Sequence, residues 1–207
     1  MGSKALKPKL LLATRNPGKA RELRQLLSGV PFHLVSLEET GVQEEVEETG
    51  DSFEENATLK GRFYARLSGL LTLAEDSGLE VDALAGGPGV HSARYGGPGL
   101  SDGDRVRLLL QKLEGVSEER RGACFRCAIA IAWPSGEVRL AEGELRGRIA
   151  FEAQGGGGFG YDPVFYLPEL GRTNAQLSLE EKNRLSHRGQ AARKAAALLR
   201  NLRAEVV

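Results

Sequence analysis

The stretch LLATRNPGKA, residues 11–20, runs from an apolar segment into a polar turn and on into a helical pattern. Residues 9–13 predict a buried strand, and the spacing of leucines over residues 19–28 predicts a helix with one apolar face. The packing of a strand against a helix does not require the polar residues between them, whereas the binding of a phosphate group does. This stretch therefore indicates both an α/β fold and a ligand site.

The turn consists of Thr14, Arg15, Asn16, Pro17, Gly18 and Lys19. At the start of a helix, backbone N–H groups and a lysine ammonium form an anion site. The turn is not a Walker A sequence, because it lacks the spacing of glycines that this motif needs. The alternative is an ordinary strand-to-helix turn in which Asn16 and Gly18 act as turn residues.

The bulk composition limits the classes of partner. The 207 residues are 41% hydrophobic and 27% charged, which fits a single domain over residues 1–207. The formal net charge is +0, so no overall field attracts nucleic acid or an acidic membrane. No apolar run reaches the roughly 18 residues needed to span a bilayer, and the first residues lack the apolar core of a signal peptide. We expect a soluble, cytoplasmic protein that binds neither nucleic acid nor membranes.

Strand and helix patterns alternate along the chain, and a long hairpin with its turn at residues 134–136 lies in the middle. This order favours an α/β architecture with a mixed sheet flanked by helices. In the helix expected over residues 52–69, Ser52 and Glu55 are a candidate capping box. The expected buried stripe of that helix is Phe53, Ala57, Phe63, Tyr64 and Leu67. The other expected strands are 32–36, 71–75, 79–84, 122–133, 137–149 and 163–167, and the other expected helices are 104–113 and the last 30 residues.

Two cysteines, Cys124 and Cys127, have the C-x-x-C spacing that can indicate zinc or redox chemistry. They fall in a predicted strand, where residues three apart point to opposite faces. The chain has no second C-x-x-C, so we expect two structural cysteines in a reducing compartment.

A pair of acids, Glu75 and Asp76, follows an apolar strand and precedes Ser77 and Gly78. Alternation points the two carboxylates to opposite faces, so one could enter a cleft while the other is solvated. A carboxylate at a strand end suits Mg²⁺ or the removal of a proton from water. The alternative is a solvated acidic turn, and the same alternative holds for the acidic run at residues 44–48.

Two later stretches are also rich in groups that bind ligands. QGGGGFGYDPVF, residues 154–165, has glycines that allow close approach of a ligand or motion of a lid, and aromatic rings on which a purine can stack. EEKNRLSHRG, residues 180–189, gathers cationic donors, and Ser186 could start a new helix that brings them together. The alternatives are a flexible loop and a solvated basic helix end. Together with the turn and the acids, these stretches match the needs of a nucleoside triphosphate with Mg²⁺.

In this order the stretches resemble the inosine triphosphate pyrophosphatase family, which hydrolyses non-standard purine nucleoside triphosphates. The matching segments run from residue 13 to residue 191 and are ATRNPGKARE, EETGDSFEENA, EDSGLEVDALAGGPGVHSARY, GGFGYDPVF and EEKNRLSHRGQA. One departure is Glu75, where relatives often have a second Asp.

The resemblance implies an elongated α/β fold of two lobes with a central substrate cleft, a homodimer, and hydrolysis of XTP, ITP or dITP to the monophosphate and pyrophosphate. It implies that Mg²⁺ is held by Glu47 and Asp76, with Asp76 also the proton acceptor, although Glu48 is an alternative to Glu47. It implies that Thr14 through Lys19 hold the triphosphate. The residues that the resemblance assigns to the rest of the nucleotide are Ser77, Phe159, Gly160, Tyr161, Asp162, Lys182, His187 and Arg188.

Two other functions compete with hydrolysis. A phosphotransferase could use the Lys19 turn, but the sequence has no motif for a second acceptor pocket. A nucleotide- or RNA-binding module would be expected to have a basic surface with many aromatic residues, and aromatics are only 6% of this chain.

Overall fold

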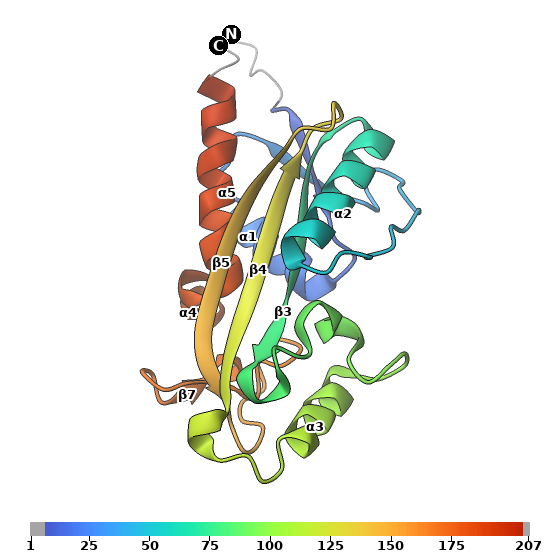
Figure 1. Cartoon of the computed structure of the whole chain (residues 1–207). Helices are drawn as coiled ribbons and strands as arrows, with labels where there is room; N and C mark the ends of the chain where they lie inside the picture. The colour runs from blue at the N-terminus through green and yellow to red at the C-terminus, as the bar shows by residue number, and fades with distance from the viewer. Residues whose placement is uncertain (1–6, 205–207) are drawn as a thin grey trace. The chain divides into compact units, whose positions relative to one another are not determined.

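Seven strands form one mixed sheet in the computed structural model, which describes residues 7–204 (Figure 1). The strand order is β2-β1-β3-β4-β5-β6-β7. β1 is parallel to β2 and β3, whereas β6 is antiparallel to β5 and β7, and this confirms the predicted mixed sheet. The strands are β1 (Lys9–Ala13), β2 (His33–Ser36), β3 (Leu71–Val81), β4 (Gly122–Ala132), β5 (Val138–Ile149), β6 (Phe165–Leu167) and β7 (Arg172–Thr173). The α-helices are α1 (Pro17–Leu26), α2 (Phe53–Ser68), α3 (Asp102–Lys112), α4 (Leu179–Leu185) and α5 (His187–Ala204), and the 3₁₀ helices are η1 (Asp82–Leu84), η2 (Gly89–Arg94), η3 (Glu118–Arg120) and η4 (Asn174–Gln176).

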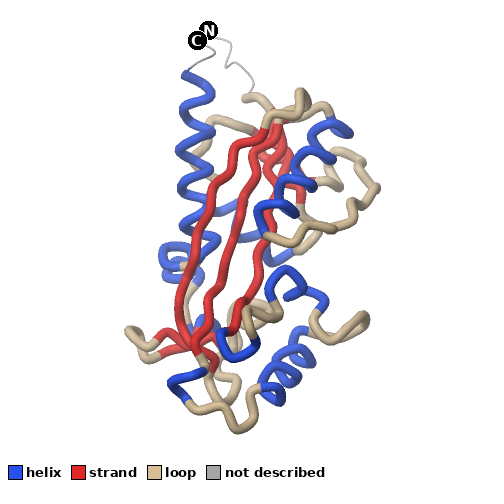
Figure 2. The backbone as a smooth tube through the Cα atoms, viewed as in Figure 1, coloured by secondary structure: helices blue, strands red, loops and turns tan. Residues whose placement is uncertain are grey.

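The described chain divides into two compact units, each made of more than one segment. The first unit holds the described residues up to Asp76, Ala128–Glu142, and the described residues from Ala191 onward. The second unit holds Ser77–Cys127 and Gly143–Gln190. The long strands β3, β4 and β5, which are neighbours in the sheet order (Figure 2), contribute residues to both units.

The first unit begins with the strand and helix of residues 11–20. Leu11 and Ala13 of β1 pack in a cluster with Val35 and Tyr64. α1 begins at Pro17, two residues before the predicted start, because the Asn16 side chain accepts a hydrogen bond from the Lys19 N–H and caps the helix. A proline in the first turn is compatible with this start, since that position needs no backbone donor. The turn is therefore shorter than the sequence suggested.

The buried face of α2 differs in part from the predicted stripe. Ser52 accepts a hydrogen bond from the Glu55 N–H, but the Glu55 carboxylate accepts from the Asp51 N–H, so only half of the predicted capping box forms. Phe53, Ala57 and Tyr64 are buried as expected, and Phe63 is partly buried. Leu67 was wrongly predicted to be buried and is 43% exposed, because the stripe passes instead through Lys60 and Gly61.

Gly61 is the point of closest approach between α2 and the sheet within the first unit. A Cβ at this position would lie 3.1 Å from the Cβ of Ala132 and 3.3 Å from the Cβ of Ala130. The absence of a side chain at residue 61 therefore lets the helix lie directly on β4. This contact brings the neighbouring side chain of Lys60 under the helix, toward the acids of β3.

β3 corrects the prediction of two short strands. It is continuous from Leu71 to Val81, so Asp76 and Ser77 lie inside a strand and not in a turn. Glu75 and Asp76 are both buried, which contradicts the expectation that one of them is solvated. The reason is that a strand covered on both faces has no solvent side for alternation to select. Two adjacent carboxylates therefore need buried partners.

The second unit has its own apolar core. Its members include Leu79 of β3, Leu109 of α3, Phe125 of β4 and Phe165 of β6. Figure 2 shows the long neighbouring strands β3, β4 and β5 in red. α3 confirms the predicted helix, with its N-terminus capped by Ser101 through a capping box with Asp104.

The predicted hairpin is also confirmed. β4 and β5 are neighbours in the sheet, and the Trp133 N–H donates to the Glu137 carbonyl at the turn. Cys124 and Cys127 lie on β4, and both are buried free thiols, as expected of structural cysteines.

The C-terminal segment forms two helices with a break at Ser186. α4 ends at Leu185, Ser186 is extended, and α5 begins at His187. The Ser186 hydroxyl oxygen accepts a hydrogen bond from the Gly189 N–H, so it caps α5 as the sequence suggested. Within the described residues, no helix is both long and apolar enough to cross a bilayer.

Candidate active site

The turn after β1 is held by its own side chains. The Thr14 hydroxyl accepts a hydrogen bond from the Asn16 N–H at 3.2 Å, and Asn16 accepts from the Lys19 N–H at 3.0 Å. Thr14, Gly18 and Lys19 are half-buried, and Arg15, Asn16 and Pro17 are exposed. These hydrogen bonds thus account for the polar side chains of Thr14 and Asn16, whereas the Lys19 ammonium takes no part in them.

Arg15 has a structural contact that the sequence did not reveal. Its guanidinium donates to the Glu44 carbonyl at 3.0 Å and pairs with the Glu45 carboxylate at 3.3 Å. Arg15 therefore fastens the acidic run of residues 44–48 beside the turn.

The Lys19 ammonium lies 3.5 Å from a carboxylate oxygen of Glu75. The side chain of Glu75 is fully buried, whereas that of Lys19 is 15% exposed. The ion pair brings the turn to the acidic residues of β3, and the exposed part of Lys19 keeps a positive charge at the surface of the first unit. The departure from the family pattern, Glu75, therefore has a partner in this chain.

Asp76 is linked to the acidic run by a lysine. The Lys60 ammonium from α2 lies 3.2 Å from Asp76 Oδ1 and 2.8 Å from Glu48 Oε1. Burial raises the pKa of Asp76 above its ordinary value, and the ammonium groups of Lys60 and Lys19 only partly offset this. Burial lowers the pKa of Lys60, but the carboxylates of Asp76 and Glu48 raise it by more, so Lys60 stays charged. Two carboxylates thus share one buried cation.

Sequence reasoning missed Lys60, although a signal for it exists. The buried positions Phe53, Ala57 and Tyr64 predict a helical stripe, and residue 60 falls on the same face one turn after Ala57 and one turn before Tyr64. A lysine on a buried helical face needs an anionic partner, because an unpaired buried charge is very costly. That spacing could have identified Lys60 as part of an acidic site.

The other oxygen of Asp76, Oδ2, is buried and has no hydrogen-bond partner within the described chain. A buried carboxylate oxygen without a donor is costly, so it fits a site that a cation or a water completes. Glu48 is the second carboxylate on Lys60, whereas Glu47 is exposed. Among the described residues, no group of three or more His, Cys, Asp and Glu side chains gathers as a cation site. The residues therefore fit Mg²⁺, which takes one or two carboxylates and completes its shell with water and phosphate oxygens.

A second cluster lies in the second unit, around the buried ion pair of Asp162 and Lys182. The Lys182 ammonium lies 2.6 Å from Asp162 Oδ2, which also accepts a hydrogen bond from the Phe159 N–H at 2.9 Å. The Phe159 ring lies 4.7 Å from the Lys182 ammonium and 5.3 Å from the Arg188 guanidinium carbon. One half-buried aromatic ring thus lies within cation–π distance of two cations.

Ser77 and Arg188 belong to the same cluster, since the guanidinium donates to the Ser77 hydroxyl oxygen at 3.0 Å. The Gly160 N–H donates to the Asp102 carboxylate, so this glycine is held by α3. The structure therefore brings together Ser77, Phe159, Asp162, Lys182 and Arg188.

Tyr161 and His187 are held by the core of the second unit. The Tyr161 hydroxyl donates to the Ser92 carbonyl at 3.0 Å, and burial raises the pKa of this phenol. The His187 ring stacks on Phe125, with ring centres 4.7 Å apart and an interplanar angle of 11°. Both residues were predicted to bind the nucleotide; here Tyr161 makes a hydrogen bond and His187 a ring contact within the second unit, and their binding to a nucleotide stays a prediction.

Close packing explains three of the four glycines of residues 155–158. A Cβ on Gly158 would lie 2.1 Å from Asp162 Oδ2, and one on Gly155 or Gly157 would lie 2.8 Å from the Ala175 carbonyl oxygen, whereas one on Gly156 would meet no atom within 4 Å. These three glycines allow the loop to pack against Asp162 and Ala175. The predicted close approach of a ligand stays a prediction.

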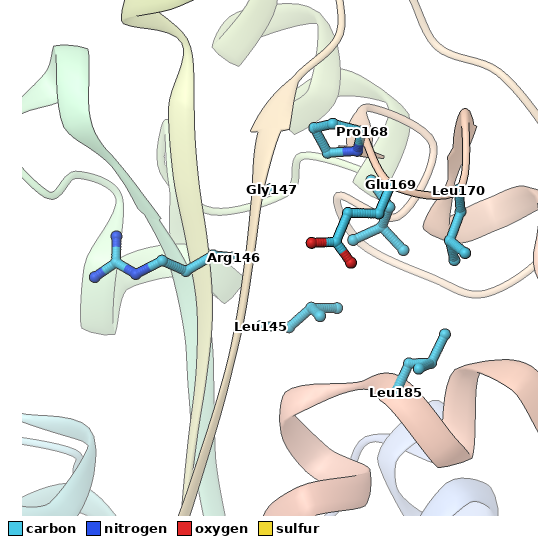
Figure 3. A pocket seen from close by; sticks show the side chains of 8 residues that line it. Leu145, Arg146, Gly147, Pro168, Glu169, Leu170 and Leu185 are labelled. Atoms are coloured by element: carbon cyan, nitrogen blue, oxygen red, sulfur yellow. The ribbon is translucent and has the colours of Figure 1, made fainter.

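A cavity of about 510 Å³ in the second unit contains none of the predicted site residues (Figure 3). Leu145, Pro168, Leu170 and Leu185 surround it, and Glu169 points among them. The leucine-rich lining has no cluster of cations, so this cavity does not suit a triphosphate. Each of the two clusters described above, one in each unit, instead gathers charged side chains.

Comparison with known sequences identifies the family of this chain. The model of the Ham1 family matches residues 10–198. A dITP/XTP pyrophosphatase of Desulforamulus reducens is 50% identical over 194 residues, which cover 94% of this chain and 96% of that protein. A dITP/XTP pyrophosphatase of Symbiobacterium thermophilum is 54% identical over 183 residues, which cover 88% and 90%.

Solved structures give the same result. A HAM1 protein from Coxiella burnetii matches with a TM-score of 0.85 and 40% identity, over 93% of this chain and 98% of that one. A nucleoside-triphosphatase, dITP/XTP pyrophosphatase, from Mycobacterium abscessus matches with a TM-score of 0.74 and 45% identity, over 92% and 98%.

Proposed function

The chain belongs to the Ham1 family, and from this premise we propose that it is a hydrolase that converts XTP, ITP and dITP to the monophosphate and pyrophosphate. Its curated relatives are named dITP/XTP pyrophosphatases. The observation that carries the proposal is Asp76, a buried carboxylate with one oxygen on Lys60 and the other without a partner among the described residues. Such an oxygen is suited to a metal ion or to a reacting water.

The first unit supplies groups for the triphosphate. A nucleoside triphosphate carries close to four negative charges, which the Lys19 ammonium and the backbone N–H groups at the start of α1 can offset. We propose that Asp76 and Glu48 hold Mg²⁺, with Glu48 in place of the predicted Glu47, because Glu48 shares Lys60 with Asp76. When bound, Mg²⁺ would neutralise phosphate charge and polarise a phosphorus–oxygen bond.

The chain's own residues then act on the water. Water adds to the α-phosphorus, the bond from that phosphorus to the bridging oxygen breaks, and pyrophosphate leaves. Asp76 Oδ2, the oxygen that is not bonded to Lys60, orients the water and accepts its proton, while Asp76 and Glu48 share the binding of Mg²⁺. Lys60 holds the other oxygen of Asp76 and so fixes the carboxylate's orientation.

The second unit supplies groups for the base. Phe159 offers a flat face for a purine, and the cations Lys182 and Arg188 lie beside its ring. Both cations carry only donors, and O6 of inosine or xanthosine is an acceptor. The 6-amino group of adenine would face them donor to donor, which leaves buried donors unpaired and disfavours ATP.

A direct test is to incubate the protein with ITP and Mg²⁺ and to identify the phosphate product. Release of pyrophosphate with IMP supports the proposal. Release of orthophosphate would indicate a different phosphatase, transfer of a phosphoryl group to a second substrate would indicate a phosphotransferase, and binding without turnover would indicate a binding module.

We also propose a homodimer in the cytoplasm. The dimer rests on the resemblance to the family, and the compartment rests on the two free cysteines, which are typical of a reducing environment. Sedimentation equilibrium distinguishes a mass of two chains from a mass of one.

Arg188→Met is expected to reduce discrimination between ITP and ATP. Methionine keeps much of the apolar stem near Phe159 but removes the N–H donors that would form hydrogen bonds with O6 of the base. The ratio of kcat/KM for ITP over ATP should fall by about tenfold or more, which corresponds to roughly 1.4 kcal/mol. Steady-state kinetics with both substrates measures this ratio, with the exposed Arg184→Met as control. An equal fall for both substrates would assign Arg188 to phosphate binding or to the fold.

Lys19→Ala is expected to raise KM for ITP by about tenfold, because a charge-assisted contact to phosphate is worth about 1.5–3 kcal/mol. The measurement is KM at saturating Mg²⁺, together with the thermal midpoint, since the loss of the Glu75 ion pair also reduces stability. Lys9→Ala, an exposed lysine of β1, is the control. An unchanged KM would show that Lys19 does not bind phosphate and only pairs with the Glu75 carboxylate.

A further inference from the structure

Asn174 is a buried polar residue that no sequence pattern singled out. It begins η4, and 1% of its surface is exposed. Its amide Nδ2 donates a hydrogen bond to Asp162 Oδ1 at 3.2 Å. This contact joins η4 directly to the ion pair of the second unit.

Asp162 therefore receives donors on both of its oxygens. Oδ2 accepts from the Lys182 ammonium and from the Phe159 N–H, and Oδ1 accepts from Asn174. The Asp162 carboxylate is 3% exposed, so these donors take the place of the water that burial removes. Because donors approach from both sides, the carboxylate cannot rotate without losing one of them, and the Lys182 ammonium is fixed with it.

The amide of Asn174 is held in a costly orientation. Its other atom, Oδ1, is buried and has no hydrogen-bond partner within the described chain. Rotating the amide by half a turn would place this oxygen against the carboxylate of Asp162, so the carboxylate determines the orientation. A leucine of similar size would avoid the unpaired oxygen but would leave Asp162 Oδ1 without its donor. What the asparagine provides is the donor to Asp162.

The segment that carries Asn174 is itself fixed to the glycine loop. The Gly157 N–H donates to the Ala175 carbonyl at 3.0 Å, and the Ala175 N–H donates to the Asp162 carbonyl at 3.2 Å. The Thr173 hydroxyl donates to the Gln154 carbonyl at 2.7 Å. Asn174 thus projects from a rigid base, and its donor has a defined position relative to the carboxylate.

We propose that Asn174 is a positioning residue for base recognition, which orients Asp162 so that the Lys182 ammonium is held beside the Phe159 ring. The proposal rests on the proposed function, in which this cluster binds the purine base. Asn174 touches neither substrate nor reacting atoms in this role; it acts through Asp162.

The test is Asn174→Leu, which has nearly the same size and lacks the donor. We expect KM for ITP to rise by about tenfold, the ratio of kcat/KM for ITP over ATP to fall by about fivefold, and kcat at saturating ITP to change by less than about threefold. The thermal midpoint should also fall, because Asp162 Oδ1 loses its donor, so the change in the ITP/ATP ratio is the readout that a purely structural role would not produce.

Gln176→Leu is the matched control from the same 3₁₀ helix. The Gln176 side chain accepts a hydrogen bond from the Thr173 N–H at 2.8 Å, and in the described structure its hydrogen bonds go to Thr173 and not to Asp162. This variant should lower the thermal midpoint but leave KM and the ITP/ATP ratio unchanged. Should leucine prevent folding at residue 174, Asn174→Ala takes its place, and its KM is compared with that of Gln176→Leu.

A double-mutant cycle decides whether Asn174 acts through Asp162. In an Asp162→Asn background, Asn174→Leu should change kcat/KM for ITP by less than about twofold, because the carboxylate that it orients is already lost. Equal effects in both backgrounds, or an unchanged KM and ratio in the single variant, would overturn the proposal. Wild-type protein that releases no pyrophosphate from ITP would instead overturn the proposed function, so the two failures are distinguishable.

Discussion

Asp76→Asn is expected to lower kcat for ITP by at least about a hundredfold, the scale on which enzymes lose a general base or a metal ligand. The amide keeps the size of the side chain and can still contact Lys60 through its oxygen. It removes the negative charge and replaces one oxygen with an NH₂ group, which can neither take a proton from water nor bind a cation. The substitution therefore affects the chemistry more than the fold.

The measurement is initial-rate pyrophosphate release with saturating ITP and Mg²⁺, together with the thermal midpoint of each protein. Asp51→Asn is the control, because Asp51 is an exposed acid close in sequence to Glu48 whose side chain makes no contact with Lys60 in the described structure. A native-like midpoint with a large loss of kcat assigns Asp76 to the reaction. Near-normal turnover by Asp76→Asn would remove Asp76 from the active site.

The turn from Thr14 to Lys19 shows which features the local sequence could predict. An apolar run, then Asn16 as helix cap and Pro17 in the first turn, are signals within a few residues of one another, so strand, turn and helix were predicted correctly apart from a two-residue shift. The resemblance to the family assigns the same turn to the nucleotide site, and it also assigns Asp76, Phe159 and Arg188 to that site.

β3 shows what local signals could not provide. Asp76, Ser77 and Gly78 have the composition of a turn, but pairing with neighbouring strands keeps them in one continuous strand. Strand formation depends on partners that lie far away in the sequence, and these partners override local preference. The same cause buries Glu75 and Asp76 together, which alternation alone could not reveal.

The choice between Glu47 and Glu48 is a third case. In a run of four glutamates over five residues, the sequence offers no local feature that separates one carboxylate from the next. What separates them is Lys60, which is 12 residues from Glu48 and 16 residues from Asp76. The spacing of the α2 stripe could have marked Lys60 as buried, but the carboxylates that it pairs with could be identified only from the structure.

Lys60→Met is expected to reduce both stability and activity. Methionine keeps the apolar stem under α2 but leaves Asp76 and Glu48 without their shared cation, and removal of one partner from a buried ion pair costs about 3 kcal/mol or more. Without Lys60 the pKa of Asp76 should rise further above its ordinary value. Burial and the charge of Glu48 raise this pKa, and among the cations that lower it only Lys19 would remain. A larger fraction of Asp76 is protonated at neutral pH, and a protonated carboxyl cannot accept the proton of water. We expect kcat for ITP to fall by about thirtyfold at pH 7 and by less at higher pH, where the carboxyl ionises again.

Two measurements separate this role from a purely structural one. The first is the pH profile of kcat, whose acid limb should move to higher pH in Lys60→Met but not in Lys112→Met, an exposed lysine of α3. The second is the thermal midpoint with Mg²⁺ in the absence of substrate, since a cation that binds the folded state stabilises it. Mg²⁺ should raise the midpoint of Lys60→Met by more than that of the wild type, because the ion offsets the carboxylate charges that Lys60 balances. A Lys60→Met protein with an unshifted pH profile and no added response to Mg²⁺ would show that Lys60 only supports packing, and that the two carboxylates do not form one electrostatic site.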